Sequence, residues 1–302
     1  MLKLQRLSPS PIMEPTERPW ESGAVFNCGV TMHKEKVCMV YRASDRDFAS
    51  LAHSEPRATE KFISSFGYAQ SDDAIHFVRD PDPIFTGLGE QEAWGVEDPR
   101  LSKLDDTFYM LYTAFGGRSW DDHRIAMASS QDLRTWKRHG IVLDESNKDA
   151  ALLETKINGK YMLFHRRLPH IWCAFSDNLK EWHDHQIIME TIPNGWEENK
   201  IGLAGQPIAT HQGYLMLYHA VDDQKTYRLG AALLDGENPT KVVRRLPQPI
   251  LGPELAWEKA GHVPNVVFSC GQVIKDDFLY VYYGGADRGI GVAGGEMDKI
   301  IF

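Results

Sequence analysis

Five similar apolar and aromatic segments recur along the chain, and any fold has to give them equivalent places. They read KVCMVYR (36–42), TFYMLYTA (107–114), KYMLFHR (160–166), GYLMLYHA (213–220) and DFLYVYYG (277–284). They are spaced by about 50 to 70 residues, and each follows a turn-like polar pair. Short runs of this kind, bounded by Gly, Asp, Asn and Pro, are typical of β-strands, and long stretches of helical period are rare. The chain is therefore predicted to be all-β.

A second pattern follows the first three segments. AQSDDAIHF (69–77), ASSQDLRTW (128–136) and AFSDNLKEW (174–182) each read as a strand end, a turn with Asp or Asn, and an aromatic residue on an outer strand. Five copies of a four-stranded unit predict a five-bladed β-propeller with a central funnel, over one domain spanning residues 1–302. A two-sheet sandwich or jelly roll is the competing architecture, but it does not explain a fivefold repeat. Residues 1–23 are rich in Pro and charge and are expected to form an extended arm that packs along the domain or reaches a partner subunit, so a homo-oligomer stays open.

Composition and charge narrow the range of ligands that the chain is expected to bind. With 42% hydrophobic and 25% charged residues the chain resembles ordinary soluble proteins, and its net charge of −9 argues against a general nucleic-acid or anionic-membrane surface. The four cysteines, at 28, 38, 173 and 270, form no CxxC pair and are expected to be buried free thiols. No metal-binding motif is present, and the first residues contain no continuous apolar segment. We expect a cytoplasmic protein that binds a neutral or sugar-like ligand and needs no metal.

The stretch Trp94-Gly-Val-Glu-Asp-Pro-Arg100 runs directly into the second repeated segment. Pro99 lacks an N–H and biases Asp98 toward an extended backbone, so the carboxylates should sit at the beginning of a strand. Such a position suits a catalytic acid. Taken alone, an Asp before Pro is more often a solvated turn residue.

Polar side chains occupy the same end of the five repeated segments and are expected to converge on the propeller axis. The positions are Arg42, Thr113, His165 to Arg167, Tyr218 with His219, and Tyr283. Lys156, Arg166, His219 and Tyr227 together would form a cationic, hydrogen-bonding cup suited to a phosphate dianion. Considered singly, Lys156 and Arg167 fit a surface ion pair and His165 fits a core histidine.

Several motifs in the same order resemble one known family. They are GVEDPR (95–100), KDAALLETKINGKY (148–161) with His165-Arg166, YRLGAALLD (227–235), NVVF (265–268) and YYGGAD (282–287). Over about residues 26–293 the chain resembles the β-mannoside phosphorylases of glycoside hydrolase family 130.

That resemblance implies a propeller enzyme that cleaves a β-mannoside with inorganic phosphate and inversion, giving α-mannose 1-phosphate and a shortened acceptor. Asp98 matches the family's catalytic acid, which acts through the 3-hydroxyl of the transferred mannose. No cofactor is implied, and phosphate is a co-substrate. The implied phosphate-binding residues are Lys156, Arg166, His219 and Tyr227, with Arg118 and Arg167. The implied binders of mannose hydroxyls, or supports of Asp98, are Asn27, Arg42, Glu97, Arg100, His165 and Asp287.

The resemblance leaves the β-1,2 or β-1,4 linkage and the acceptor open, because GLAGQP (202–207) and Arg288 depart from the usual family pattern. The sequence leaves three other functions open. A mannosidase on the same fold would use Glu197, Glu198 or Glu254 as a base for water. A non-catalytic carbohydrate-binding propeller would use tryptophan platforms, and a furanosidase would place three carboxylates on separate blades, which this sequence fits least.

Overall fold

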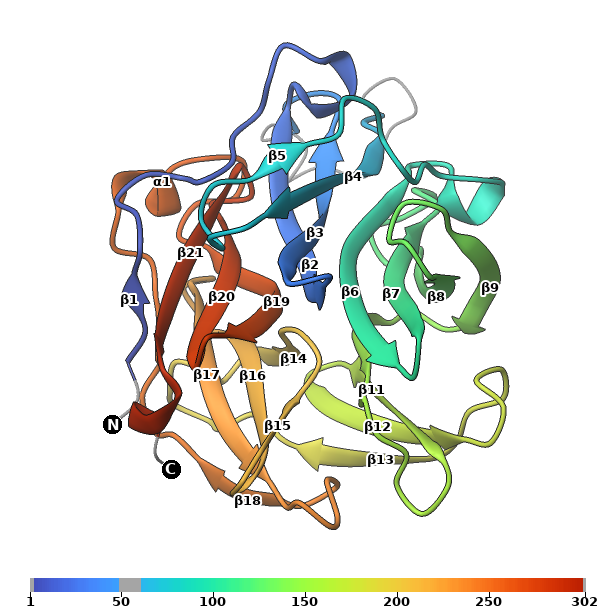
Figure 1. Cartoon of the computed structure of the whole chain (residues 1–302), viewed down its shortest axis with the longest axis vertical. Coiled ribbons are helices and arrows are strands. Elements are labelled where there is room, and N and C mark those ends of the chain that lie inside the picture. Colours follow the sequence, from blue (N-terminus) through green and yellow to red (C-terminus); the bar gives the residue numbers. More distant parts are fainter. Residues whose placement is uncertain (1–2, 49–60, 301–302) are drawn as a thin grey trace.

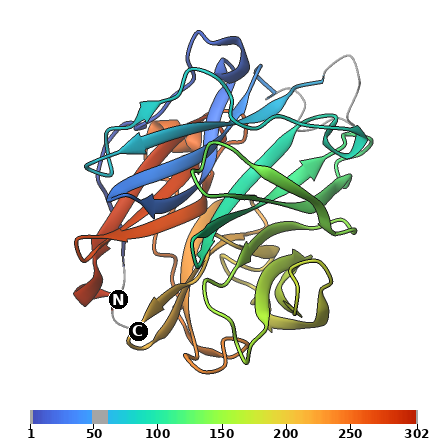
Figure 2. The same ribbon diagram turned by 45° about the vertical axis from the view of Figure 1, so that its right-hand side comes forward.

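Five antiparallel sheets surround a central axis in the computed structural model, which describes residues 3–48 and 61–300 (Figure 1). Within each sheet, most strands pair with the next strand along the chain, and the innermost strands gather around the axis. Figure 2, turned by 45° about the vertical axis, shows the twist of these sheets. The predicted five-bladed propeller is confirmed, and the sandwich alternative is wrong.

Each blade consists of one innermost strand followed by strands that step outward. Blade 1 contains β2 (Ala24–His33), β3 (Lys36–Ser44), β4 (Ser64–Ser71) and β5 (Val78–Arg79). Blade 2 contains β6 (Val96–Leu104), β7 (Thr107–Phe115), β8 (His123–Ser130) and β9 (Lys137–Leu143). Blade 3 contains β10 (Lys148–Leu152), β11 (Tyr161–Arg167), β12 (His170–Ser176) and β13 (His183–Met189). Blade 4 contains β14 (Lys200–Leu203), β15 (Ile208–Thr210), β16 (Gly213–Val221), β17 (Tyr227–Leu234) and β18 (Val242–Arg245). Blade 5 contains β19 (Val267–Lys275), β20 (Phe278–Gly285), β21 (Gly289–Glu296) and β1 (Gln5–Arg6).

Among residues 3–48 and 61–300, helical structure is limited to short turns outside the sheets. The helix α1 spans Ala256–Lys259, and 3-10 turns span Pro19–Glu21, Glu90–Glu92 and Met297–Lys299. The five repeated segments of the sequence are the second strands of the blades, β3, β7, β11, β16 and β20.

The N-terminal segment closes the ring of blades. β1 pairs with β21, so the outer strand of the last blade comes from the beginning of the chain. Met13 forms a further antiparallel bridge to Ile290. The predicted arm therefore packs along the propeller, and this pairing joins the two ends of the chain.

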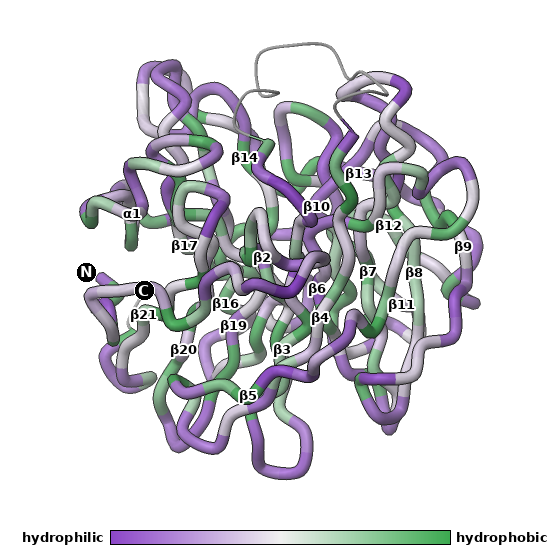
Figure 3. Tube along the Cα trace, turned by 90° about the horizontal axis from the view of Figure 1, so that it is seen from above, coloured by the Kyte–Doolittle hydropathy of each residue, from purple (hydrophilic) through white to green (hydrophobic). Residues whose placement is uncertain are grey.

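The hydrophobic core is divided among the junctions between blades. One cluster joins Val25 and Met39 of blade 1 to Val292 of blade 5, and another joins Phe164 of blade 3 to Met216 of blade 4. Similar clusters fill the other three junctions. Seen from above in Figure 3, many of the hydrophobic stretches lie in the strands, and the loops at the edge are largely hydrophilic. Each blade thus needs both neighbours to bury its faces.

The second sequence pattern forms the turn between the third and fourth strands. Asp73 Oδ1, Asp132 Oδ1 and Asn178 Oδ1 each accept two backbone N–H bonds from the residues that follow. The aromatic residue that ends each pattern packs against a junction cluster. These predicted turns are confirmed. All four cysteines are buried and free, as expected.

Four blades contain the same buried triad of Glu, Tyr and Arg. The tyrosine of the second strand donates its hydroxyl to a glutamate that precedes the innermost strand, and an outer-strand arginine pairs with that glutamate. The members are Glu21, Tyr41 and Arg79; Glu92, Tyr112 and Arg138; Glu197, Tyr218 and Arg245; and Glu258, Tyr283 and Arg6. Each carboxylate is buried, and the triad satisfies its charge while joining three parts of one blade.

No helix among residues 3–48 and 61–300 combines the length and apolar character needed to cross a bilayer.

The triad of blade 5 tests the ring closure, since Arg6 donates from Nε and Nη2 to the fully buried carboxylate of Glu258, each at 2.8 Å. We predict that Arg6→Ala lowers the free energy of unfolding by about 1–3 kcal/mol, because charged hydrogen bonds to a buried group are lost. The melting temperature should fall by several degrees, and Arg6→Lys should give an intermediate value because it keeps the charge without the planar fork. Lys3→Ala, at an exposed position, is the matched control; equal melting temperatures for the two alanine variants would contradict this account.

Candidate active site

A cavity of about 330 Å³ opens near the beginning of the innermost strands, and all five blades contribute to it. The innermost strands supply Asn27, Asp98, Lys148, Lys200 and Phe268. The propeller therefore gathers side chains that are far apart in the sequence.

Left-handed residues at β-bulges direct three of the polar side chains. Asn27, Asp98 and Asp149 have φ angles of 43°, 52° and 60°. Each lies where the register between the first and second strands of its blade shifts. A bulge re-aims a side chain relative to the strand, and Asn and Asp tolerate this conformation better than most residues. The same β-bulge with a left-handed residue therefore occurs in three successive blades, and in each blade that residue has a polar side chain.

Asp98 is held rigidly within a charged environment. Its Oδ1 accepts hydrogen bonds from Asn27 Nδ2 at 2.8 Å and Arg42 Nη1 at 3.1 Å. Burial raises the pKa of Asp98, but Arg42, Lys148 and Arg100 outweigh burial and leave that pKa below its ordinary value. The free protein therefore holds Asp98 as a carboxylate.

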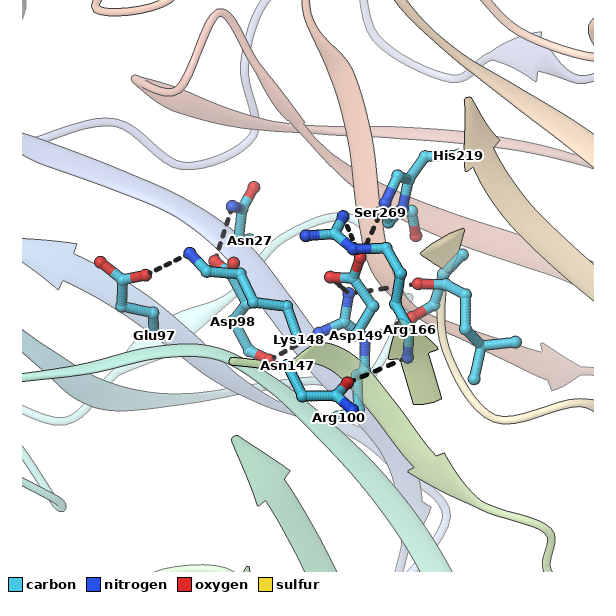
Figure 4. A network of polar contacts seen from close by, with 12 residues as sticks. Asn27, Glu97, Asp98, Arg100, Asn147, Lys148, Asp149, Arg166, His219 and Ser269 are labelled. Atoms are coloured by element: carbon cyan, nitrogen blue, oxygen red, sulfur yellow. Dashed lines mark hydrogen bonds and ion pairs between the residues drawn. The ribbon is translucent and has the colours of Figure 1, made fainter. Parts of the chain in front are cut away.

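Glu97 organises the cations beside Asp98 without lining the cavity. It accepts from Arg42 Nη2 at 2.6 Å and from Lys148 Nζ at 2.9 Å. Burial lowers the pKa of Lys148, but Glu97 and Asp98 more than compensate and raise that pKa. Lys148 thus stays charged beside Asp98, and Figure 4 shows it reaching toward Glu97.

Successive side chains of the second strand in each blade point alternately toward and away from the axis. This alternation decides which of the predicted residues face the axis. Arg42, Thr113, Arg166, His219 and Gly284 pair with the first strands at equivalent places. The preceding residue in each blade points away from the axis, because successive side chains of a strand point to opposite faces. In four blades that residue is the triad tyrosine, so the predictions that Tyr218 and Tyr283 converge on the axis are wrong.

Asp149 fixes the cationic side of the cavity. Its carboxylate pairs with Arg100 Nη2 at 2.8 Å, Arg166 Nη1 at 2.6 Å and His219 Nε2 at 3.1 Å. Burial opposes ionisation, but Arg166, His219 and Arg100 hold the pKa of Asp149 well below its usual range. Gly202 leaves the room for this contact, because a Cβ there would lie 2.3 Å from Asp149 Oδ2.

Arg166, Lys200 and Tyr227 line the cavity beside Asp149. Among the described residues, the buried Nε of Arg166 has no hydrogen-bond partner. The ammonium of Lys200 lies 5.4 Å from the centre of the Tyr227 ring, and burial followed by Arg166 lowers the pKa of Lys200 to about 8. Burial also raises the pKa of Tyr227 to about 12, so its hydroxyl keeps its proton at neutral pH. These groups are donors suited to an anion.

Three residues predicted to bind phosphate lie outside this cavity. Lys156 is exposed in the β10–β11 hairpin, with its ammonium over the Tyr161 ring. Arg118 pairs with Asp122 at 2.7 Å, and Arg167 pairs with Glu145 at 2.8 Å. Their positions do not support the predicted role. His219 is fully buried behind Asp149, so it can support the anion site but does not line it.

The predicted sugar-binding residues also separate into two groups. Asn27, Arg42 and Asp287 line the cavity. Burial, together with Asp98 and Glu97, raises the pKa of Asp287 to about 7, while Arg42 and Lys148 oppose the rise. Glu97 supports Arg42 and Lys148, while two further predicted residues, Arg100 and His165, are buried outside the cavity lining.

Sequence reasoning missed Lys148, Asp149 and Lys200. The strand register contained a signal for the first two, since Lys148 and Asp149 occupy the blade 3 places of Glu97 and Asp98. Lys200 begins β14 and had no comparable signal. The cavity also includes an aromatic residue, Trp120, which stacks on Phe115 with ring centres 6.0 Å apart.

The residues that the structure describes contain no group of three or more His, Cys, Asp or Glu side chains arranged to hold a metal ion.

Comparison with known proteins gives consistent results. The sequence profile of glycoside hydrolase family 130, described as β-1,4-mannooligosaccharide phosphorylase, matches residues 48–302. A β-1,2-mannobiose phosphorylase of Thermoanaerobacter sp. (strain X514) is 55% identical over 303 residues, and a 1,2-β-oligomannan phosphorylase of the same strain is 52% identical over 304 residues; both comparisons cover 100% of each chain.

A solved structure has the same fold. The β-1,2-mannobiose phosphorylase of Listeria innocua, in complex with β-1,2-mannobiose, superposes with a TM-score of 0.87 at 26% identity, covering 98% of both chains. The profile match and the full-length relatives agree with the residues that first indicated the family. This chain belongs to glycoside hydrolase family 130.

Proposed function

We propose that this protein is an inverting β-mannoside phosphorylase, which transfers a mannosyl group from an oligosaccharide to inorganic phosphate. The observation that carries the proposal is the cavity itself, where Lys148, Arg166 and Lys200 line the same hollow as the carboxylate of Asp98. An anionic nucleophile needs charge compensation and orientation, which these cations supply.

The reaction needs one acid and no base. A phosphate oxygen attacks the anomeric carbon, the glycosidic C–O bond breaks, and the leaving oxygen takes a proton that originates on Asp98 and passes through the mannose 3-hydroxyl. The products are α-mannose 1-phosphate and the shortened acceptor. An inverting hydrolase would also need a carboxylate base to activate water.

Asp98 must gain a proton before it can act, since its pKa is lowered in the free protein. Phosphate binding provides a route, because its negative charge offsets the cations, Lys148 among them, that favour the carboxylate form. A sugar over Asp98 also displaces water and disfavours the charged form further. Asp98 would thus be protonated, and able to act as the acid, once both substrates are bound.

The same geometry weakens the hydrolase alternative. Glu197 is held by Tyr218 and Arg245 in the blade 4 triad, and Glu254 is exposed and pairs with Arg6. Glu198 accepts the backbone N–H of Asn194. None of these three glutamates lines the cavity, so none of the bases weighed for water activation is in place.

β-1,2-linked mannosides are the substrates we propose, since the two relatives above 50% identity are named for β-1,2-mannobiose and 1,2-β-oligomannan. Trp120 at the cavity supplies an apolar ring on which a sugar can stack.

The first prediction of this proposal concerns products. β-1,2-mannobiose and β-1,2-mannotriose should release mannose 1-phosphate when inorganic phosphate is present, and release almost no sugar without it. Parallel β-1,4-linked substrates should react more slowly. Both products can be followed by chromatography, and free mannose formed at the same rate without phosphate would refute phosphorolysis.

The second prediction concerns the acid. Asp98→Asn should reduce kcat by about 10²–10⁴-fold, because an amide cannot supply the proton. The melting temperature should change little, since Asn keeps the shape and an oxygen acceptor for Asn27 and Arg42. A large fall in melting temperature with proportionate loss of activity would instead assign Asp98 a structural role.

The third prediction distinguishes the role of Lys200 from that of Lys156. Lys200→Ala should raise the KM for phosphate about tenfold or more while changing the KM for mannoside little, because the lost cation is on the anion side. Lys156→Ala is the matched control and should change neither value. A larger effect of Lys156→Ala would reverse our assignment.

The same lysine gives a pH signature. The cation is present below its pKa of about 8 and is lost above it, so kcat/KM for phosphate should fall as the pH rises through about 8. Lys200→Arg should move that fall to higher pH, because a guanidinium stays charged there. An unchanged profile in Lys200→Arg would show that another group titrates.

A further inference from the structure

Blade 3 lacks the Glu–Tyr–Arg triad of the other four blades, and its replacement contacts the cationic side of the cavity. His165 occupies the tyrosine position, one residue before Arg166. His185, on the outer strand β13, takes the place of the arginine, and Asn147 contacts His165 where a glutamate would contact tyrosine. Asn147 immediately precedes Lys148 at the beginning of β10.

This replacement brings the buried hydrogen-bond network of blade 3 closer to the cavity than the triads of the other blades. In blades 1, 2 and 4 the triad glutamate lies five residues before the inner-strand residue that pairs with the axis-facing position (21 to 26, 92 to 97 and 197 to 202). Asn147 lies one residue before its counterpart, Lys148. The shorter connection allows Asn147 to contact both the outer network and the residues that line the cavity.

The hydrogen bonds of Asn147 define one arrangement of protons. Its Oδ1 accepts from the backbone N–H of Arg166 at 3.1 Å, so Nδ2 faces Glu145 and His165 Nδ1, each at 3.0 Å. His165 Nδ1 must then accept, and its Nε2–H donates to His185 Nδ1 at 3.1 Å. Burial, with His185 and Arg167, lowers the pKa of His165 to about 3, which agrees with a neutral ring.

The backbone of Asn147 adds a third connection. Its carbonyl lies 3.2 Å from Nδ1 of His123, a residue that lines the cavity, and its N–H donates to the His123 carbonyl at 3.4 Å. With only 1% of its surface exposed, Asn147 therefore joins β8, β10 and β11 beneath the cationic side of the cavity. Figure 4 shows its side chain directed at the Arg166 backbone.

We propose that Asn147, held in turn by His165 and His185, is a positioning residue that sets Arg166 and Lys148 for phosphate. The inference rests on the proposed function. Arg166 depends on such support, because its side chain is tied to Asp149 through Nη1 while its buried Nε has no partner within residues 3–48 and 61–300. The network thus fixes the backbone from which the guanidinium extends, and leaves donor capacity for a ligand.

Two variants and one control test this inference. Asn147→Ala removes the contact to Arg166, and should raise the KM for inorganic phosphate about tenfold with the KM for β-1,2-mannobiose within about twofold. His185→Ala removes only the far end of the network, on a half-buried side chain, and should raise the phosphate KM by about threefold. Tyr283→Phe is the matched control from blade 5, where Gly284 follows and no side chain extends toward the axis. It should lower the melting temperature without changing either KM.

The outcomes distinguish the two proposals. Equal changes in both KM values, or no change in either, in folded Asn147→Ala would overturn the positioning role and leave a structural one. If Asn147→Ala does not fold, His185→Ala decides by the same comparison. Wild-type turnover that does not require phosphate would refute the proposed function itself, whatever the variants show.

Discussion

The buried guanidinium of Arg100 holds the centre of the propeller together. From β6 it donates to the carbonyls of Ala204 at 2.7 Å and Leu203 at 3.1 Å, and to the carboxylate of Asp149 at 2.8 Å. It also donates to the backbone carbonyl of Asp98 at 3.0 Å. One side chain thus ties blades 2, 3 and 4 at the axis, and satisfies backbone groups that the innermost strands cannot pair among themselves.

Arg100 contacts the β-bulges at Asp98 and Asp149, through the backbone carbonyl of Asp98 and the side chain of Asp149. Asp98 and Asp149 occupy equivalent bulges in neighbouring blades, yet their surroundings differ. Asp149 is enclosed by three cationic or donor groups and serves as their anchor, whereas Asp98 faces the cavity with Asn27 and Arg42 on one oxygen. Two carboxylates at equivalent β-bulges therefore acquire separate roles through their hydrogen-bond partners. Differences in environment commonly separate catalytic from structural carboxylates in proteins.

The fold was predictable because its repeats are visible in the sequence. The strands β3, β7, β11, β16 and β20 agree closely with the five segments, and the Asp turns follow as expected. The site was less predictable, since two geometric facts are not visible in a linear pattern. Strand alternation turned His165 away from the axis, next to Arg166 that faces it. Lys156 lies at the opposite end of β11 from Arg166, and a strand of that length separates its ends by roughly 20 Å.

The buried triad glutamates are one reason why the conspicuous carboxylates of the sequence do not reach the cavity. In four blades the conspicuous carboxylates of the sequence are consumed by tyrosine and arginine within the triads, so they are unavailable as bases. Blade 3 has no triad glutamate, and the side chains of Asn147, His165 and His185 take the place of the triad. The nearby carboxylate of Glu145 accepts from Asn147 Nδ2 at 3.0 Å and is paired with Arg167 at 2.8 Å. A glutamate in place of Asn147 would add a second carboxylate beside Glu145, and its charge would weaken the attraction of Lys148 and Arg166 for an anion. The blade without the triad is thus the blade that supplies Lys148 and Arg166, and no triad carboxylate lies beneath these two cations.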